Sequence, residues 1–339
     1  MNKIITTAIP TAMMALVTLN LFACADKTEL PETNIEIGND TVSGGEFRIQ
    51  MTKAVPDRYF SEATEEGQVV RIEYASRDYT HDDRPATLKP AYVYLPYGYD
   101  ESNKYDVVYL MHGWTGTANE NFEADGGRQK NMIDWMIQQG GCRPVIVVSP
   151  TWDKDNQAKG WSESCREIAV FHNEYEHDLI PAVEGRFSTY AEATDRDGII
   201  ASRDHRAFGG FSLGSVTTWY IFEHCFDLQR FFLPMSGDSW HVATFGGQTQ
   251  LEETARFLAS VVRASQFGTA DGFHVWHAVG TQDSRFYQTH NQALACMLLT
   301  DGFTPANFSY HKKEGGLHDF NASMEFVYNG LAFLLPQEW

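Results

Sequence analysis

Residues 206–220 read Arg206-Ala-Phe-Gly-Gly210-Phe-Ser212-Leu-Gly214-Ser-Val216-Thr-Thr-Trp-Tyr220 and contain the pattern G-x-S-x-G. The first five residues can form a strand and the last five can begin a helix, which is the setting that this pattern requires. Glycines on both sides of Ser212 let the backbone turn sharply, so the hydroxyl projects above the sheet. The helix that follows offers its amides and its positive dipole end to developing negative charge. The stretch therefore predicts an activated serine at the end of a buried strand.

Short apolar runs alternate with helical patterns on both sides of this stretch. The predicted strands are Val70–Tyr74, Ala91–Leu95, Val107–Met111, Val145–Val148, Ala207–Phe211, Phe231–Met235, Phe273–Val279 and Phe308–Tyr310. The predicted helices cover about 129–138, 172–185, 213–224, 250–263, 288–299 and 321–334. Buried strands that alternate with helices indicate crossover units and a mostly parallel sheet. An antiparallel hairpin followed by six parallel strands, with helices on both faces, predicts an α/β protein of the α/β-hydrolase fold.

A serine hydroxyl is a poor nucleophile unless a neighbouring base removes its proton. In this fold the acid and then the base follow the serine along the chain. Among the 12 histidines, His318 is the predicted base, because it lies in a glycine-rich loop after the last predicted strand. Asp283 is the predicted acid, since it lies in the loop after the preceding strand. Asp238, one strand earlier, is the alternative.

Two backbone donors are needed for the oxyanion of an acyl-transfer intermediate. One is the amide of Leu213, directly after the serine. The other is expected from the loop His112-Gly113-Trp114-Thr115-Gly116, with the amide of Trp114 as the candidate. For His112 itself a structural hydrogen-bonding role is predicted.

Five stretches match one family, and one of them contains the serine motif. They are Tyr94–Tyr99, Tyr109–Gly113, Phe187–Tyr190, Ala201–Gly214 and Met235–Trp240. On these stretches the chain resembles carbohydrate esterase family 1 from about Gln68 to its C-terminus, and most closely the feruloyl esterase domains attached to bacterial xylanases. The resemblance implies removal of hydroxycinnamoyl groups, such as ferulate, from arabinose on xylan. It also places the nucleophile, acid and base on Ser212, Asp283 and His318.

Three positions depart from the family pattern. Ser215 stands where the family usually has glycine, and Trp114 where it has a further glycine or alanine. After His318 the chain reads Asp-Phe, where relatives often carry tryptophan. The triad is unaffected by all three, but Trp114 is expected to narrow the acyl pocket.

Trp152, Trp240 and Trp114 follow the ends of strands, where this fold builds its cleft, so they are candidates for stacking against an aromatic acyl group. The alternative is that loop tryptophans merely cover the core. Acylated xylan or arabinoxylan oligosaccharides are the expected partners. An acetylxylan esterase, an acyltransferase and a non-catalytic carbohydrate-binding surface lipoprotein on a hydrolase scaffold remain the alternatives.

Composition bounds the remaining possibilities. A net charge of -19, with 43% hydrophobic and 21% charged residues, fits a globular protein and argues against a nucleic-acid partner. No metal-ligand spacing is seen among the cysteines and histidines, so neither a metal nor another cofactor is expected. Cys142, Cys165, Cys225 and Cys296 leave one disulfide possible.

The N-terminus carries a targeting pattern. Residues 1–25 read as a signal peptide in which Lys3 is followed by an apolar run. Leu21-Phe-Ala-Cys24 resembles a lipobox that would make Cys24 a lipid anchor, whereas Ala23-Cys24-Ala25 also fits an ordinary signal peptidase site. We expect an irregular lead-in over residues 26–66 and one esterase domain over 67–339, secreted or lipid-anchored outside the cytoplasm.

Overall fold

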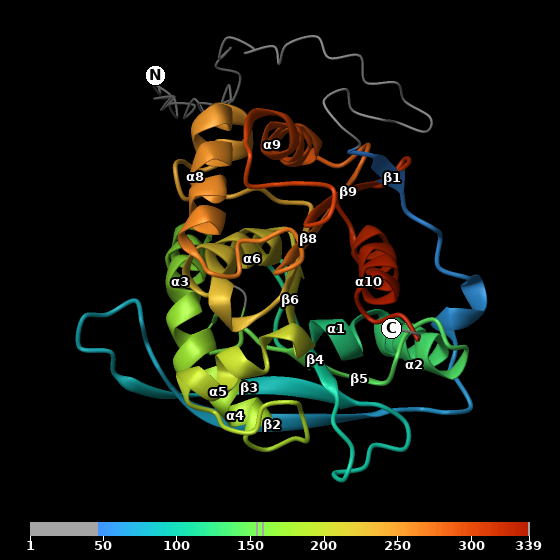
Figure 1. The fold of residues 1–339 in the computed structure, drawn as a ribbon. Coiled ribbons are helices and arrows are strands. Elements are labelled where there is room, and N and C mark those ends of the chain that lie inside the picture. Colours follow the sequence, from blue (N-terminus) through green and yellow to red (C-terminus); the bar gives the residue numbers. More distant parts are fainter. Residues whose placement is uncertain (1–46, 154, 158, 338–339) are drawn as a thin grey trace, which may run out of the picture. The chain divides into compact units, whose positions relative to one another are not determined.

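A single nine-stranded sheet forms the centre of the described part of the chain (Figure 1). The computed structural model describes residues 47–153, 155–157 and 159–337, so the targeting segment with Cys24 and residues 26–46 of the lead-in lie outside the described residues. The strand order is β1-β9-β8-β7-β6-β4-β5-β3-β2. The strands are β1 (Ile49–Met51), β2 (Gln68–Arg77), β3 (Ala86–Leu95), β4 (Asp106–Met111), β5 (Val145–Ser149), β6 (Arg206–Phe211), β7 (Phe231–Met235), β8 (His274–Gly280) and β9 (Phe308–Lys313).

Strand directions match the predicted architecture. β2 and β3 pair in antiparallel fashion and β3 runs antiparallel to β5, whereas the strands from β5 through β4, β6, β7 and β8 to β9 are all parallel. The prediction of a front hairpin and six parallel strands is therefore confirmed. The short β1 adds a further parallel strand beside β9.

Helices cover both faces of the sheet. In Figure 1, α3, α6 and α8 lie on one side of the sheet, and α2 and α10 lie on the other. The helices are α1 (Glu120–Glu123), α2 (Arg128–Gln138), α3 (Trp161–Glu174), α4 (Ile180–Glu184), α5 (Arg196–Ala201), α6 (Leu213–His224), α7 (Gly246–Thr249), α8 (Leu251–Ala264), α9 (Phe286–Leu299) and α10 (Phe320–Leu334).

One predicted helix begins in the wrong place. The pattern predicts a helix from about residue 172, but α3 begins at Trp161 and a π-helical turn over Tyr175–Leu179 joins it to α4. The inner face of the first turns of α3 includes the buried polar residues Ser164 and Glu167, so its apolar stripe is thin. Periodicity alone therefore missed these turns.

Residues 47–66, which the sequence suggested as part of an irregular lead-in, pack against the sheet and α2. Ile49 pairs with Tyr310 in the β1–β9 ladder. Val55 and Tyr59 are buried in the core, where the Tyr59 ring stacks 5.8 Å from Trp135. Three residues are too few for β1 to show a strand alternation in the sequence, so only the fold reveals this pairing.

β4, β5 and β8 are buried along their whole length, as expected for strands covered on both faces. β6 is fixed at its start by Arg206, whose guanidinium donates two hydrogen bonds of 2.6 Å to the buried carboxylate of Glu184. This buried pair anchors the strand that carries the serine motif.

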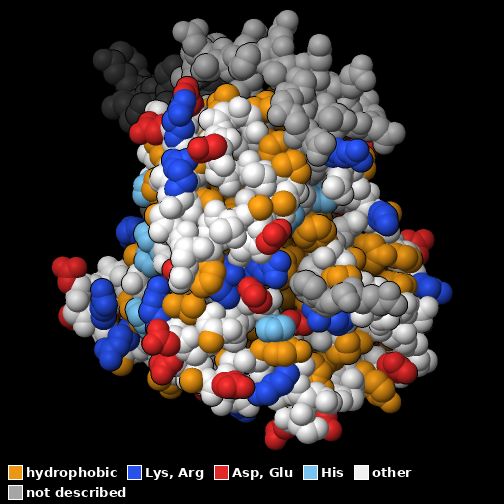
Figure 2. All heavy atoms as spheres, in the orientation of Figure 1, with side chains coloured by type: hydrophobic (Ala, Val, Ile, Leu, Met, Phe, Trp, Pro, Cys, Tyr) orange, Lys and Arg blue, Asp and Glu red, His pale blue; other side chains and the backbone are white. Residues whose placement is uncertain are grey.

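The surface carries mixed charge. On the face shown in Figure 2, acidic and basic side chains are interspersed with hydrophobic ones.

Cys142, Cys165, Cys225 and Cys296 are all free thiols, so the disulfide that the sequence left possible is not formed among them. Within the described ranges, no helix combines the length and the hydropathy that a bilayer crossing requires.

Candidate active site

Ser212 lies in the tight turn between β6 and α6. Its backbone has φ 60° and ψ -118°, a conformation that L-residues rarely adopt. A Cβ atom added to Gly210 would lie 2.6 Å from the backbone of Gly214, and one added to Gly214 would lie 2.3 Å from the carbonyl oxygen of Met111. The two glycines are therefore required by close approach of the turn to itself and to β4, which leaves the serine side chain at the strand end.

His318 connects Ser212 to Asp283. The imidazole Nε2 lies 2.8 Å from the Ser212 Oγ, and Nδ1 lies 2.9 Å from each carboxylate oxygen of Asp283. Asp283 is buried, while about a quarter of the His318 side chain is exposed. With Nδ1–H donating to the carboxylate, Nε2 is left as the acceptor for the serine hydroxyl. The structure thus brings the three predicted residues into one hydrogen-bonded chain.

Two further donors hold the Asp283 carboxylate. The Ser236 hydroxyl donates to Oδ2 at 2.7 Å, and the backbone amide of Arg285 donates to Oδ1 at 2.6 Å. Ser236 has a positive φ of 56° at the end of β7. Sequence reasoning missed this contact, although Ser236 lies in one of the stretches that carry the family resemblance.

Asp238, the alternative acid, forms hydrogen bonds with other residues and not with His318. Its carboxylate accepts hydrogen bonds from the Trp240 indole at 3.1 Å and from the Gly247 amide at 2.8 Å. Burial raises the pKa of the Asp238 carboxyl to about 6. Its contacts hold the loop after β7 against α7, whereas Asp283 is the carboxylate on His318.

The loop after β4 reaches the serine. A Cβ atom added to Gly113 would lie 3.6 Å from the Cβ of Ser212, so the Gly113–Trp114 backbone passes close to the nucleophile position. The Leu213 amide lies in the first turn of α6, where N–H groups have no intrahelical acceptor. Both predicted oxyanion donors thus belong to segments that border Ser212.

His112 fixes this loop from below. Burial lowers the pKa of its imidazole to about 4, so the ring is neutral near pH 7. Nδ1 lies 2.7 Å from the Gly113 carbonyl oxygen and must donate, which leaves Nε2 to accept from the Thr151 hydroxyl at 2.9 Å. These contacts match the structural role expected for His112.

A cleft opens over Ser212 and His318. Its aromatic lining comes from Trp114, Trp161, Phe211 and Phe320. The lining residues are Gly113, Trp114, Thr115, Glu120, Trp161, Phe211, Ser212, Arg285, His318, Asp319, Phe320 and Ser323. Burial raises the pKa of the Glu120 carboxyl in this cleft to about 7.

Three tryptophans form a continuous wall. The Trp114 ring lies 5.1 Å from Trp161, and Trp161 lies 5.7 Å from Trp240. Trp114 is 39% exposed and its indole donates to the Lys159 carbonyl oxygen at 3.0 Å, whereas Trp240 is buried behind Trp161. Trp161 was not predicted from sequence, because the start of α3 was missed.

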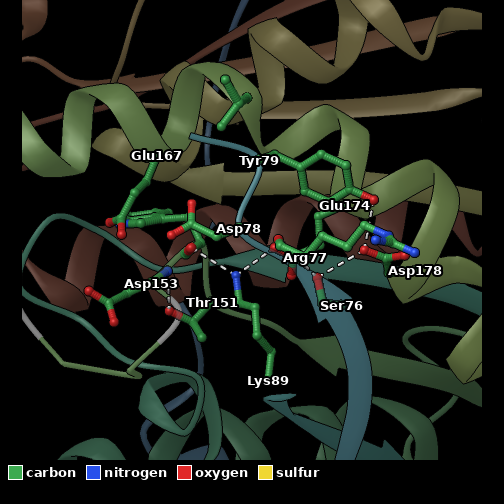
Figure 3. Close-up of polar contacts among 12 residues, drawn as sticks. Ser76, Arg77, Asp78, Tyr79, Lys89, Thr151, Asp153, Glu167, Glu174 and Asp178 are labelled. Atoms are coloured by element: carbon green, nitrogen blue, oxygen red, sulfur yellow. Dashed lines mark hydrogen bonds and ion pairs between the residues drawn. The ribbon is translucent and has the colours of Figure 1, made fainter. Parts of the chain in front are cut away.

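Trp152 lies apart from this wall. Its ring packs 4.1 Å from His112, and it borders a smaller hollow with Lys89 and Glu174. The buried Lys89 ammonium donates to the Trp152 carbonyl oxygen at 2.8 Å and to Glu174 at 2.6 Å, within the polar cluster of Figure 3. Trp152 therefore contacts the loop after β4 through His112.

Ser215, where the family usually has glycine, has a clear place. Its hydroxyl donates to the Gly237 carbonyl oxygen at 2.9 Å and so joins α6 to the loop after β7.

Among the described residues, no group of three or more His, Cys, Asp or Glu side chains could hold a metal ion. The chemistry available at this site is acyl transfer by a serine with a histidine base.

Comparisons with known proteins agree with this chemistry. A family model described as "Putative esterase" matches residues 88–334. Endo-1,4-beta-xylanase Y of Acetivibrio thermocellus is 34% identical over 290 residues, which are 84% of this chain but 25% of that protein. The chain thus spans about a quarter of the length of this curated relative.

Solved structures share the fold. A serine-to-alanine mutant of the feruloyl esterase module from Clostridium thermocellum, complexed with sinapinate, has 31% identity and a TM-score of 0.72 over 84% of this chain and 94% of that chain. A CE1 ferulic acid esterase from Anaeromyces mucronatus, in complex with ferulic acid, has 21% identity and a TM-score of 0.60 over 84% and 97% of the two chains, which supports the fold alone. The resemblance to feruloyl esterase domains of xylanases is confirmed.

Proposed function

Because the chain belongs to this esterase family, we propose that it is a serine esterase that releases hydroxycinnamoyl groups, such as ferulate, from plant cell-wall xylan. Carboxylic ester hydrolysis is the activity of the family. The observation that carries the assignment of residues is the hydrogen-bonded chain from Ser212 through His318 to Asp283. Ser212 is the nucleophile, His318 the base and Asp283 the acid.

The reaction proceeds in two halves through an acyl-enzyme. His318 Nε2 accepts the Ser212 proton as Oγ attacks the ester carbonyl, and the amides of Leu213 and Trp114 stabilise the oxyanion. His318 then donates that proton to the departing sugar oxygen. A water molecule, deprotonated by His318, attacks the acyl-serine carbonyl, and His318 returns this proton to Ser212 Oγ as the acyl–oxygen bond breaks and the free acid leaves. Asp283 orients the imidazole and stabilises its charged form throughout.

Support for an aromatic acyl group comes from the cleft. Trp114 and Trp161 line it and Trp240 backs them, so a planar ring finds stacking partners within reach of Ser212. Trp152, the third tryptophan that the sequence offered for this role, packs against His112 apart from these rings. Relatives described as xylanases and as feruloyl esterase modules point to the same substrates, acylated xylan or arabinoxylan oligosaccharides.

The deciding experiment is a substrate panel. Purified protein and its Ser212→Ala variant are assayed on methyl ferulate, methyl p-coumarate, acetylated xylan and nitrophenyl acetate. Hydroxycinnamate esters should give the highest kcat/KM, and the variant should be inactive on all four. A protein that deacetylates xylan and ignores ferulate would instead be an acetylxylan esterase. Binding of xylan without any hydrolysis would indicate a carbohydrate-binding protein, and transfer to an added alcohol an acyltransferase.

The site of action is proposed to be outside the cytoplasm. The support is the signal pattern in residues 1–25, with Cys24 as the candidate for lipidation. Mass spectrometry of the membrane fraction tests it. A diacylglyceryl adduct on Cys24 supports the anchor, whereas a soluble product that begins at Asp26 excludes it.

A further inference from the structure

One cationic side chain lies in the catalytic cleft. Arg285 is the only lysine or arginine among the described residues that line it, and it is half-buried. Its backbone amide donates to Asp283 Oδ1 at 2.6 Å, which places it on the wall beside the triad. Because this bond uses the backbone, the side chain is free to serve another purpose.

An aromatic ring positions the guanidinium of Arg285. Its central carbon lies 4.6 Å from the centre of the Phe245 ring, within the range of a cation–π contact. The Phe245 ring lies 5.2 Å from Trp240, so it extends the tryptophan wall that begins at Trp114. Phe245 has a positive φ of 59°, which is costly for a bulky residue. This strained backbone conformation places the Phe245 ring against Arg285.

Asp238 is the anionic group that acts on this guanidinium within the described part of the chain, and the two interact electrostatically without an ion pair or a hydrogen bond. The guanidinium forms neither an ion pair nor a hydrogen bond there, apart from its contact with Phe245. The two carboxylates that line the cleft are engaged elsewhere. Asp319 accepts from the Ala322 amide at the start of α10, and Glu120 packs against Gly116 in the loop after β4. The Asp238 oxygens accept from Trp240 and Gly247, so the N–H donors of Arg285 have no carboxylate hydrogen-bonded to them. A half-buried guanidinium with open donors is suited to a ligand carboxylate, which its planar shape fits.

We propose that Arg285 binds a carboxylate of the substrate and selects acidic esters over neutral ones. This inference rests on the proposed esterase function and names a subclass of its substrates. The carboxylate can belong to a uronic acid of the glycan or to a second acid group of a dicarboxylic acyl chain. The glycan is the favoured source, since Arg285 is hydrogen-bonded to Asp283 and lines the same cleft as His318, which donates the proton to the departing sugar oxygen.

The test compares matched ester pairs. Feruloyl esters of glucose and of glucuronate form one pair, and methyl ferulate and the monomethyl ester of a diferulate form the other. We expect wild-type protein to prefer the acidic member of one pair by about tenfold in kcat/KM, as for one charge-assisted contact in a partly solvated cleft. Arg285→Gln should abolish this preference and Arg285→Lys should retain part of it. Added salt should weaken it.

Arg256→Gln is the matched control, since it removes the same charge from the exposed face of α8 and should leave the ratio unchanged. An effect on the glucuronate pair identifies the glycan as the source, and one on the diferulate pair identifies the acyl group. The inference would be overturned if Arg285→Gln left the ratio of kcat/KM between acidic and neutral members unaltered in both pairs. Calorimetric binding of both pairs to Ser212→Ala repeats the comparison without turnover. If wild-type protein hydrolyses no ester but the variant still binds acidic members more tightly, the proposed function fails and the inference stands.

Discussion

The Nε2 atom of His318 lies 2.8 Å from the Oγ atom of Ser212, although 106 positions separate the two residues in the chain. The parallel order of β6, β7, β8 and β9 produces this contact, since the loops that follow β6, β8 and β9 open at the same edge of the sheet. The loop after β8 adds Asp283 to the same chain of hydrogen bonds.

Ser212→Ala should reduce ester hydrolysis by about 10⁶-fold, because a triad acts as a unit and loses its effect with its nucleophile. Steady-state rates on methyl ferulate measure the loss, and an unchanged thermal midpoint verifies the fold. A variant that kept a tenth of the wild-type rate would disprove the role of Ser212.

Asp283→Asn should lower kcat by about 10⁴-fold, since the amide favours the wrong tautomer of His318. Asp238→Asn should cost roughly tenfold or less, because Asp238 bonds to Trp240 and Gly247 and not to His318. Parallel kinetics of the two variants measure the difference. The opposite ranking would transfer the acid role to Asp238.

Ser236→Ala should lower kcat by roughly fivefold, as expected for loss of about 1 kcal/mol from one hydrogen bond to the Asp283 carboxylate. As a positioning residue, Ser236 should leave KM little changed, and Ser236→Thr should restore part of the rate. A proportional rise in KM with unchanged kcat would argue against this role.

Trp161→Ala should weaken methyl ferulate turnover by about 1–3 kcal/mol in kcat/KM, since it removes a ring that lines the cleft. Trp240→Ala should act in the same direction through Trp161, and acetyl ester turnover should fall much less in both variants. Trp152→Ala is the comparison, because its ring packs on His112 and its loss should affect both esters alike. Equal losses on both esters for Trp161→Ala would remove it from acyl recognition.

Glu120→Gln should stabilise the protein more at pH 8 than at pH 5. Burial raises the pKa of Glu120 to about 7, above the 4.5 of an ordinary glutamate, so the folded state favours the protonated carboxyl. The associated stability is fully present below about pH 4.5 and is lost as the pH rises through about 7. Thermal midpoints of the variant and of wild-type protein at both pH values measure the difference. Glu252→Gln, on the exposed face of α8, serves as the control. If the thermal midpoint of the variant exceeded that of wild-type protein by less at pH 8 than at pH 5, the burial of Glu120 would be contradicted.

Elements with local signals could be predicted from the sequence. Glycine spacing around Ser212, the alternation of apolar runs with helical patterns, and the position of His318 after the last strand are each contained in a few neighbouring residues. These signals were enough for the fold class and for Ser212 and His318, whereas they left Asp283 and Asp238 as alternatives for the acid.

Which loops meet above the sheet is visible only in the folded protein. Asp283 and Asp238 both follow strands, and only the folded loops show that one faces His318 while the other holds Trp240. No local sequence pattern predicted that Trp161 lines the cleft or that Arg285 contacts Phe245. Such contacts join residues far apart in the chain through individual backbone conformations, including the positive φ angle of Phe245. Their energies depend on packing among all the loops at one edge of the sheet, which no short stretch of sequence contains.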